Sequence, residues 1–295
     1  MLGKSKPIYT VLKHLILITL SLLFVLPILM VVSISLSNEA EVVRQGYSLL
    51  PRGFDLSAYQ YVFKKPETIL NAYKVTIFVS FVGTFTSVFI MMMCAYSLSR
   101  RVFKWRKIIN FYLFFTMLFG GGLVPKYILI SQYLKLNDTV LVLILSHLVN
   151  VWYLFILRTF IKGIPESIIE SASVDGAGEF RIFWSFIIPL SKPAIATVGL
   201  FMLLIYWNEW MTAMLYISNS KLYTLQYLLQ RILNNLQAML QNMDMMSASM
   251  RNGEEVPSET IRMALAVVAA GPVLFIMPFF QKYFTRGMTF GAVKE

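Results

Sequence analysis

The chain has 295 residues, of which 57% are hydrophobic and 14% charged, and its mean hydropathy is +0.67. Soluble globular domains carry about a quarter charged residues, so this composition excludes an ordinary soluble protein and indicates a membrane protein. The net charge of +11 does not indicate nucleic-acid binding, because the basic residues flank apolar segments instead of forming one surface.

Six apolar segments are long enough to cross about 30 Å of hydrocarbon as helices, which takes roughly 17–25 residues. In chain order they are Leu15–Leu36, Val75–Ser99, Ile108–Val124 (reaching about Ser131 if Lys126 extends to the interface), Thr139–Ile161, Pro193–Tyr216 and Met263–Gln281. Helices are expected because every backbone N–H and C=O must be bonded internally where water is absent. The predicted fold class is an all-α integral membrane protein with six transmembrane helices over residues 15–285.

Lysine and arginine gather at the ends of alternate apolar segments, which predicts that those loops are cytoplasmic. The clusters are Lys4, Lys6 and Lys13; Arg100, Arg101, Lys104, Arg106 and Lys107; Arg158, Lys162, Arg181 and Lys192; and Lys282, Arg286 and Lys294. Residues 1–14, 162–191 and 286–295 are therefore predicted to be cytoplasmic, so that both termini face the cytoplasm. The loops 37–71 and 217–260 mix acidic and basic residues and are predicted to be extracytoplasmic.

Three local features qualify this topology. The first apolar segment is longer than the roughly 7–15-residue core of a signal peptide and is expected to remain as an anchor. The glycines 120–122, followed by Pro125, predict a break in the third span near its outer end. A methionine-rich stretch in the last outer loop lacks His and Cys, so a contact surface for a binding protein is expected there rather than a metal site. Its methionines are Met239, Met243, Met245, Met246 and Met250.

Residues 162–191, here named the Glu170 loop, have the pattern of two short amphipathic helices with a bend between them. Pro165 suits a first helical turn, and Gly176 and Gly178 permit a sharp bend. Pro189 and Pro193 are expected to end the second helix. Such a segment lies flat at the membrane surface with its apolar side available to a partner protein, or else it only anchors in lipid headgroups. The apolar residues are Ile168, Ile169 and Ala172 in the first helix and Phe180, Phe183, Trp184 and Ile187 in the second.

Glu170, Gly176 and Pro189 stand at a spacing that resembles the EAA loop of permease subunits in ATP-binding-cassette importers. That pattern is Glu-Ala-Ala, three residues, Gly, nine residues, Ile, one residue and Leu-Pro. Here Ser171 stands for the first Ala, and Phe186 and Ile188 stand for Ile and Leu. The resemblance extends over most of the chain to carbohydrate permeases of the maltose-importer G-subunit type, in the oligosaccharide permease C branch. The segments that carry it are 119–125, 164–166, 191–194, 207–208, 225–226, 281–284 and 291–294.

The resemblance implies a type I importer permease in the bacterial cytoplasmic (inner) membrane. Its implied partners are a second homologous permease, two copies of a cytoplasmic ATPase, an extracytoplasmic solute-binding lipoprotein and membrane lipid. The chain itself is expected to bind no cofactor and to be no enzyme. It has no Gly-x-x-x-x-Gly-Lys-Ser/Thr loop, so ATP and Mg would be used by the separate ATPase. The residues implied to couple the chain to that ATPase are Glu166, Glu170, Ala172, Asp175, Gly176, Ala177, Gly178, Phe183 and Pro189.

Polar groups within a predicted span are costly and therefore suggest a function. Aromatic faces and amide or carboxylate groups suit a sugar, whose C–H patches stack while its hydroxyls form hydrogen bonds. The alternative is an aromatic belt at the outer interface with a carboxylate paired to a neighbouring helix. His147 is interpreted as an interhelical hydrogen-bonding residue, and no metal site is predicted. The predicted substrate-pathway residues are Tyr206, Trp207, Asn208, Glu209 and Trp210.

The function that these patterns favour is a permease subunit that forms half of the pathway for an oligosaccharide and couples to an ATPase through residues 165–190. One alternative is a permease for another small solute in the same importer class. A stand-alone secondary transporter would need intramembrane charges for ion coupling, and Glu209 and His147 are the candidates. A membrane-embedded enzyme is least favoured, because no metal-ligand cluster or paired carboxylates are expected to face one another across loops.

Overall fold

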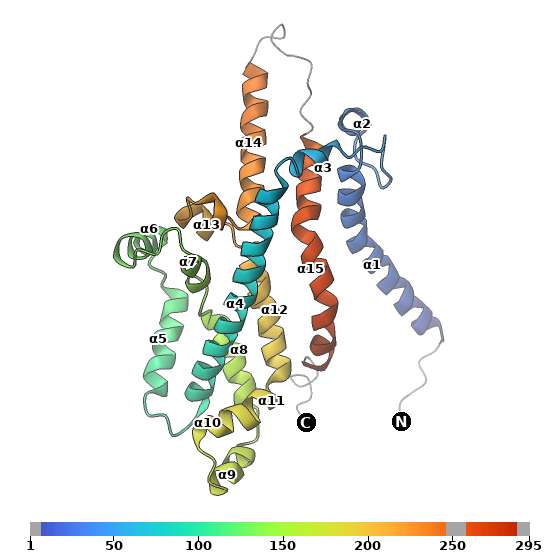
Figure 1. The fold of residues 1–295 in the computed structure, drawn as a ribbon. Helices are drawn as coiled ribbons and strands as arrows, with labels where there is room; N and C mark the ends of the chain where they lie inside the picture. Colours follow the sequence, from blue (N-terminus) through green and yellow to red (C-terminus); the bar gives the residue numbers. More distant parts are fainter. Residues whose placement is uncertain (1–6, 246–257, 288–295) are drawn as a thin grey trace. The chain divides into compact units, whose positions relative to one another are not determined.

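The computed structural model describes residues 7–245 and 258–287, and the regular structure of this part of the chain is helical (Figure 1). Its one strand-like contact is an isolated antiparallel bridge between Ser37 and Phe54. The all-α prediction is therefore confirmed. The predicted segments 1–14, 217–260 and 286–295 each include residues outside the described ranges, and so does the methionine-rich stretch.

The chain forms two compact units. The first comprises residues 1–66 and 229–272, and the second comprises residues 67–228 and 273–295. The helices of the first unit are α1 (Pro7–Ser35), α2 (Glu39–Gln45), α3 (Ser57–Val62), most of α14 (Leu225–Met245) and the first part of α15 (Glu259–Gly287).

Helix α1 contains the first predicted span and is left uncovered by its own unit. None of the residues in its most apolar stretch is buried, and Leu22 and Phe24 are 62% and 71% exposed. An apolar surface of this extent requires lipid or another protein around it. The geometry of α1 thus fits a helix surrounded by a membrane.

The carboxylate of Glu39 in α2 holds the start of α15. Glu39 Oε1 accepts hydrogen bonds from the backbone N–H groups of Ser258 (3.0 Å) and Glu259 (2.9 Å). Glu39 Oε2 accepts from the backbone N–H (2.9 Å) and the hydroxyl (2.7 Å) of Thr260. The first N–H groups of a helix lack intrahelical partners, and the helix dipole favours an anion there. One side chain therefore joins two segments of the first unit that are about 220 residues apart in sequence.

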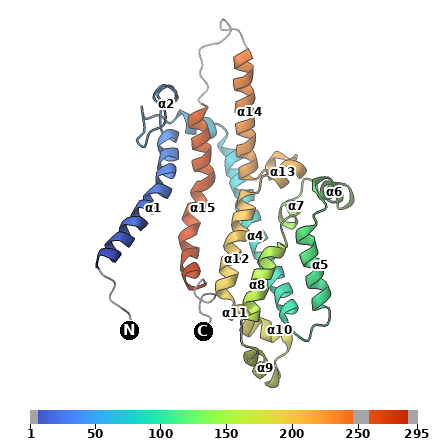
Figure 2. The ribbon, with the colours of Figure 1, turned by 180° about the vertical axis from the view of Figure 1, so that it is seen from behind.

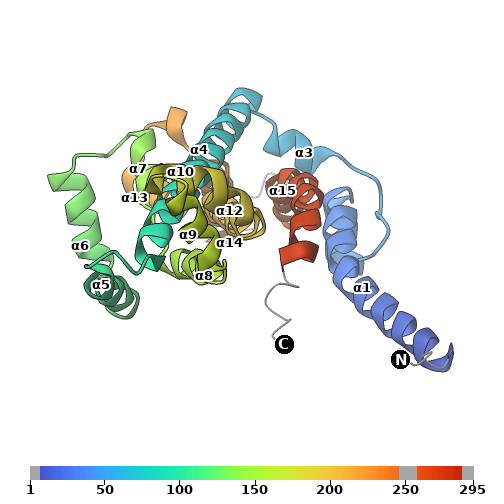
Figure 3. The ribbon, with the colours of Figure 1, turned by 90° about the horizontal axis from the view of Figure 1, so that it is seen from below.

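The second unit contains the other helices (Figures 1 and 2). They are α4 (Pro66–Ser99), α5 (Arg106–Leu118), α6 (Leu123–Ile128), the π-helical turn η1 (Leu129–Tyr133), α7 (Val140–Leu145), α8 (Val151–Lys162), α9 (Glu166–Val174), α10 (Glu179–Ile182), the π-helical turn η2 (Phe183–Ile187), α11 (Ile188–Leu190), α12 (Lys192–Asn208), α13 (Met211–Tyr216) and the 3-10 turn η3 (Ser220–Leu222). Helix α8 packs against α5 and α12, and α7 packs against α13. Seen from below in Figure 3, α9 and α10 lie over the ends of α8 and α12.

Two of the described helices are each long and apolar enough to cross a membrane: Val11–Ser35 within α1, and α4. Two bent pairs meet the same criterion jointly. One is α5 with α6 and η1, bent by 114°, and the other is Glu179–Leu190 with α12, bent by 78°. The predicted second span is the later part of α4, which begins at Pro66 as one continuous helix. The total of six crossings stays a prediction.

Three of the predicted spans are interrupted. Helix α5 ends at Leu118, and Gly122 adopts a left-handed backbone conformation with φ of 84°, which confirms the break predicted from the glycines. The expectation of one continuous helix over Thr139–Ile161 is wrong, because α7 ends at Leu145 and α8 begins at Val151. The continuous helix expected over Pro193–Tyr216 is also wrong, since the chain leaves the helical conformation after Asn208.

The break before α8 has a capping residue as its cause. The Asn150 side-chain oxygen accepts hydrogen bonds from the backbone N–H groups of Trp152 (3.1 Å) and Tyr153 (3.4 Å). These are orphan donors at the start of a helix, and asparagine is among the preferred residues for satisfying them. A single amide thus starts a new helix inside an apolar run that hydropathy alone would read as one helix.

Tyr206 of α12 forms the centre of the second unit. Its side chain is 1% exposed, and its hydroxyl donates to the carbonyl oxygen of Ile144 (2.8 Å). Because that bond uses the tyrosine proton, the Ser87 hydroxyl, 2.9 Å away, is the donor in the second bond. Gly83, one turn before Ser87 on α4, makes room for the ring. Tyr206 therefore joins α4, α7 and α12.

We expect Gly83→Ala to lower the apparent melting temperature of the purified protein. A Cβ at Gly83 would lie 2.7 Å from the Tyr206 Cζ, and the two hydrogen bonds of the hydroxyl prevent the ring from moving aside. Overpacking of this kind costs about 1–3 kcal/mol. The matched control is Gly199→Ala on α12, where the added Cβ meets nothing within 4 Å. Equal melting temperatures for the two variants would contradict the prediction.

Candidate functional site

The Glu170 loop forms two helical segments with a bend, as predicted. The first is α9, which begins after Pro165, so the proline precedes the helix rather than occupying its first turn. The second runs from Glu179 to Leu190 through α10, η2 and α11. Pro189 lies in its last turn, and Pro193 lies in the first turn of α12 instead of ending the segment before it.

The bend depends on Gly176. The Ala177 N–H donates to the Ala172 carbonyl oxygen (2.9 Å), and the Gly176 N–H donates to that of Ser173 (3.1 Å). This pair of bonds is the Schellman arrangement, in which the residue after the helix takes a left-handed conformation. Gly176 has φ of 79°, and a Cβ there would meet nothing within 4 Å. Glycine is therefore required by the backbone conformation, which costs other residues about 1–2 kcal/mol, and not by crowding.

The apolar side of the loop packs against its own chain. Ala172 and Phe183 are 5% and 4% exposed, and the Phe183 ring lies 5.6 Å from that of Tyr96 on α4, centroid to centroid. This differs from the expectation that the apolar side is available to a partner. Four apolar side chains of the loop are nevertheless exposed, and two of them, Phe180 and Trp184, belong to the predicted apolar face: Val174 (87%), Phe180 (71%), Trp184 (45%) and Leu190 (44%). Ala172 and Phe183 thus position the loop and do not line its outer surface.

Two of the loop's acids bind basic residues of the same unit. A Glu179 oxygen lies 2.8 Å from Arg100 Nη2, and the other accepts a hydrogen bond from the Tyr96 hydroxyl. Burial by itself would raise the pKa of the Glu179 carboxyl, but the hydrogen bonds from Arg100 and Tyr96 outweigh it and lower that pKa. Glu166 pairs with Arg101 across 3.4 Å. The loop is therefore tied to the end of α4 by charge as well as by apolar contacts.

The other two acids of the loop have no such partner among the described residues. Glu170 and Asp175 are exposed, and within the described residues their side chains take part in no hydrogen bond or ion pair. Gly176 and Gly178 are also exposed, and Ala177 is half-buried. Together these residues form the outer surface of the bend. Carboxylates that form no ion pair among the described residues, beside a rigid turn, suit contact with a basic partner protein.

The Glu209 carboxylate closes the break between α12 and α13. Its Oε1 accepts from the backbone N–H of Thr212 (2.6 Å), and its Oε2 lies 2.9 Å from His147 Nε2. His147 Nε2 also lies 3.3 Å from the Thr212 hydroxyl of α13, so the hydrogen bond predicted for His147 is present, although His147 lies in the break between α7 and α8 and not within a helix. The Glu209 carbonyl oxygen accepts from the Thr224 hydroxyl (3.2 Å). Glu209 therefore acts as a helix cap paired with a neighbouring segment.

The predicted pathway residues do not share one surface. Tyr206 and Trp207 are 1% and 2% exposed and belong to the core of the unit. Asn208 is exposed, and its Oδ1 accepts from Gln226 Nε2 at 3.5 Å, while Trp210 is half-buried. Among the described residues no group of His, Cys, Asp and Glu could hold a metal ion. Asn208 and the partly exposed Glu209 and Trp210 are the members of the set that remain accessible to a solute.

Sequence reasoning missed the Tyr96–Arg100–Glu179 contact. Arg100 is one of several basic residues in a short loop, where its charge signals only membrane orientation, and Tyr96 lies in an apolar segment. Their partner is about 80 residues further along the chain. The one available signal was the presence of acids in a loop otherwise flanked by basic residues.

Comparison with known proteins identifies the family of this chain. Residues 5–290 match the family described as Binding-protein-dependent transport system inner membrane component. The polygalacturonan/rhamnogalacturonan transport system permease protein YtcP of Bacillus subtilis (strain 168) is 40% identical over 278 residues, which cover 94% of this chain and 95% of that protein. Protein LplC of the same organism is 36% identical over 270 residues, covering 92% and 89%.

A solved structure has the same fold. It is the crystal structure of a bacterial ABC transporter involved in the import of the acidic polysaccharide alginate, with a TM-score of 0.77 and 28% identity over 96% of this chain and 99% of that chain. The family match and the two relatives each cover nearly the whole chain. The chain therefore belongs to the binding-protein-dependent transport system inner membrane component family, as a carbohydrate-type permease and not as an enzyme.

Proposed function

We propose that the chain is one of two homologous permease subunits that together form the pathway of an oligosaccharide importer in the bacterial cytoplasmic (inner) membrane. Two copies of a cytoplasmic ATPase would bind ATP and Mg, and a solute-binding lipoprotein would deliver the sugar outside. The observation that carries the coupling role is the exposed surface of the bend, where Glu170 and Asp175 are uncommitted while the other side of the loop is held to α4.

The proposed topology has six crossings with both termini in the cytoplasm. It is supported by the basic residues that cluster beside alternate apolar segments. The uncovered apolar surface of α1 fits a helix that faces lipid or the second permease. The Glu170 loop would then lie on the cytoplasmic side, where the ATPase is.

The geometry supports a rigid route for movement from the loop into the second unit. A displacement of α9 is transmitted through the Gly176 bend to Glu179, which is bonded to Arg100 and Tyr96 at the end of α4. The same segment continues through α11 into α12, whose Tyr206 binds α4 and α7. A push at one surface would therefore move several helices together, as alternation between two global states requires.

The names of the relatives suggest the substrate class. YtcP is named for polygalacturonan and rhamnogalacturonan, the solved structure for the acidic polysaccharide alginate, and AraQ of Bacillus subtilis (strain 168), 27% identical, for arabinooligosaccharides. We propose an oligosaccharide, and an acidic one as the first to test. The exposed Asn208 amide suits hydroxyl recognition in such a pathway.

The test is uptake by the complete complex in proteoliposomes, with its binding protein outside and ATP inside. Labelled oligogalacturonide should accumulate only with ATP, and an ATPase variant lacking its phosphate-binding lysine should abolish accumulation. Uptake that persists without the ATPase would refute the importer role and favour a secondary transporter. Selective uptake of arabino-oligosaccharide instead would refute the acidic substrate and leave the importer role intact.

A further inference from the structure

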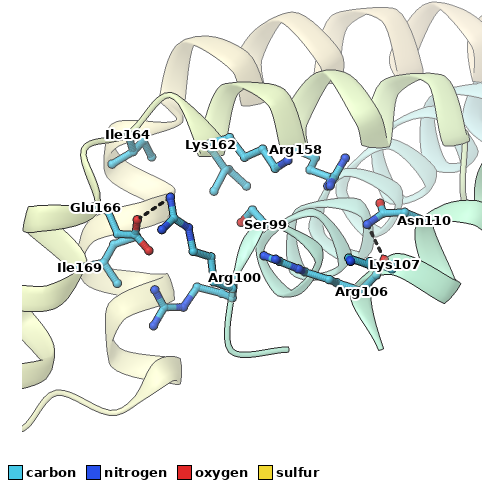
Figure 4. Close-up of a pocket in the computed structure, with 12 residues that line it drawn as sticks. Ser99, Arg100, Arg106, Lys107, Asn110, Arg158, Lys162, Ile164, Glu166 and Ile169 are labelled. Carbon is cyan, nitrogen blue, oxygen red and sulfur yellow. Dashed lines mark hydrogen bonds and ion pairs between the residues drawn. The ribbon is translucent and has the colours of Figure 1, made fainter. Parts of the chain in front are cut away.

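A basic cavity lies where the end of α4, the start of α5, the end of α8 and the start of α9 meet (Figure 4). Its volume is about 500 Å³, within the roughly 300–1,000 Å³ of pockets that take small ligands. Glu166 is the one carboxylate among its lining residues. The lining cations are Arg100, Arg101, Arg106, Lys107, Arg158 and Lys162.

The positive charge of the cavity exceeds what the chain neutralises. Arg100 and Arg101 are paired with Glu179 and Glu166. The other four cations take part in no ion pair with the described residues, and Arg158 Nε donates only to a backbone carbonyl oxygen, that of Leu98 (3.2 Å). The pKa of Lys162, the first residue after the predicted fourth span, is lowered chiefly by the charge of Arg158. These cations therefore repel one another, and an anion from outside the chain would reduce that repulsion.

The side chains come from different helices and enclose a shared space. Figure 4 shows Arg158 and Lys162 of α8 on one side of the cavity and Arg106 of α5 on the other. An anion placed between them can receive charge-assisted hydrogen bonds from both helices. A phosphate group, with several acceptor oxygens, suits guanidinium and ammonium donors arranged in this way.

The surroundings of the cavity favour a lipid as the source of that phosphate. Helix α5 starts at Arg106, and one turn beyond Lys107 and Asn110, on the same side of the helix, Phe111 and Phe114 are 69% and 51% exposed. An acyl chain can lie along these residues while its headgroup occupies the cavity, whereas a free phosphate ion gains nothing from them. Basic pockets between membrane helices on the cytoplasmic side are suited to anionic headgroups.

We propose that the basic cavity binds the phosphate headgroup of an anionic phospholipid from the cytoplasmic leaflet. This inference rests on the cytoplasmic position proposed for the Glu170 loop. Glu166 and Ile169 of α9 line the same cavity, so the bound headgroup would contact the helix that carries Glu170. Anionic lipid would thereby stabilise the position of α9 against α4, α5 and α8.

The test measures binding of fluorescently labelled phosphatidylglycerol to the complete complex in neutral mixed micelles. The variant Arg106→Gln with Lys162→Gln removes two unpaired cations from opposite sides of the cavity. Each cation near an anionic lipid surface contributes roughly a fivefold effect, so binding should weaken about 30-fold. The matched control, Lys104→Gln with Lys192→Gln, removes the same charge from exposed cytoplasmic-side residues that do not line the cavity and should leave binding unchanged.

Three results would overturn the proposal. Equal weakening in both double variants would show only a general charge effect, and displacement of the lipid by millimolar inorganic phosphate would indicate a free-phosphate site. Binding to the permease pair that disappears when the ATPase is present would assign the cavity to acidic side chains of that partner. If the double variant does not assemble, the single variants Lys107→Gln and Lys162→Gln, both at exposed side chains, give the same comparison. Lipid binding is measured without transport, so its failure would not affect the importer role.

Discussion

Replacing Glu170 with alanine is expected to reduce ATP-dependent uptake at least about tenfold while leaving the amount of folded complex unchanged. The Glu170 side chain is exposed and has no hydrogen-bonding or ionic partner among the described residues, so its removal costs the fold little. If the carboxylate is desolvated against a basic residue of the ATPase, its loss costs about 2–5 kcal/mol of that contact. Uptake and ATP hydrolysis are measured on the same proteoliposomes, and hydrolysis should continue without driving uptake.

Two controls separate contact with the ATPase from a general loss of charge. Glu67→Ala removes an exposed acid at the start of α4, outside the Glu170 loop, and should transport like the parent protein. Glu166→Ala removes an acid of the same loop that is half exposed but already paired with Arg101, so it should reduce uptake less than Glu170→Ala does; an exposed pair of this kind is worth about 0–1 kcal/mol, so the fold should change little. Normal uptake by the Glu170 variant would contradict the coupling role of this surface.

Replacing Glu209 with alanine is expected to destabilise the folded protein, with loss of transport as a consequence. The change leaves the Thr212 N–H without its acceptor and removes the partner of His147 in a region that is largely buried. Leaving buried groups of this kind unpaired costs about 2–4 kcal/mol in total. The measurement is the apparent melting temperature of the purified complex, together with its yield from membranes.

Comparison with neighbouring variants shows whether Glu209 acts on structure or on the solute. Glu209→Gln keeps an oxygen for the Thr212 N–H and should lose less stability than the alanine variant. Asn208→Ala changes an exposed side chain and should leave the melting temperature unchanged, so a defect in its uptake would indicate contact with the sugar. A Glu209→Ala protein that is as stable as the parent but inactive would show that the carboxylate serves the pathway rather than the fold.

The positions of the apolar segments could be predicted from hydropathy, but two of their interruptions could not. Asn150 and Glu209 each lie within a long apolar stretch, where one polar residue changes the average little. Each nevertheless accepts backbone N–H groups of the helix that follows. Each break is stabilised by the hydrogen-bond geometry of one side chain. A hydropathy average over a window of residues does not detect that geometry.

The sequence predicted the local features of the candidate site, but not which face of the Glu170 loop packs against its own chain. The spacing of Glu170, Gly176 and Pro189 indicated the resemblance to the EAA loop, and Gly176 indicated the bend of the Glu170 loop. Periodicity also indicated that one face of the loop is covered, but not whether its own chain or a partner covers it. The structure shows Ala172 and Phe183 buried within the chain. Tyr206 is a similar case, because an aromatic residue suited to a sugar is equally suited to a core.

The sequence by itself determined that the chain is a membrane protein, that it resembles an importer permease, and where its Glu170 loop bends. These features depend on composition and on backbone preferences that neighbouring residues set. Only the tertiary structure decided which charges meet: Arg100 with Glu179, Glu39 with the start of α15, and the cations of three separate segments around one cavity. Electrostatic energy depends on distance in space, and the folded arrangement of the helices sets that distance.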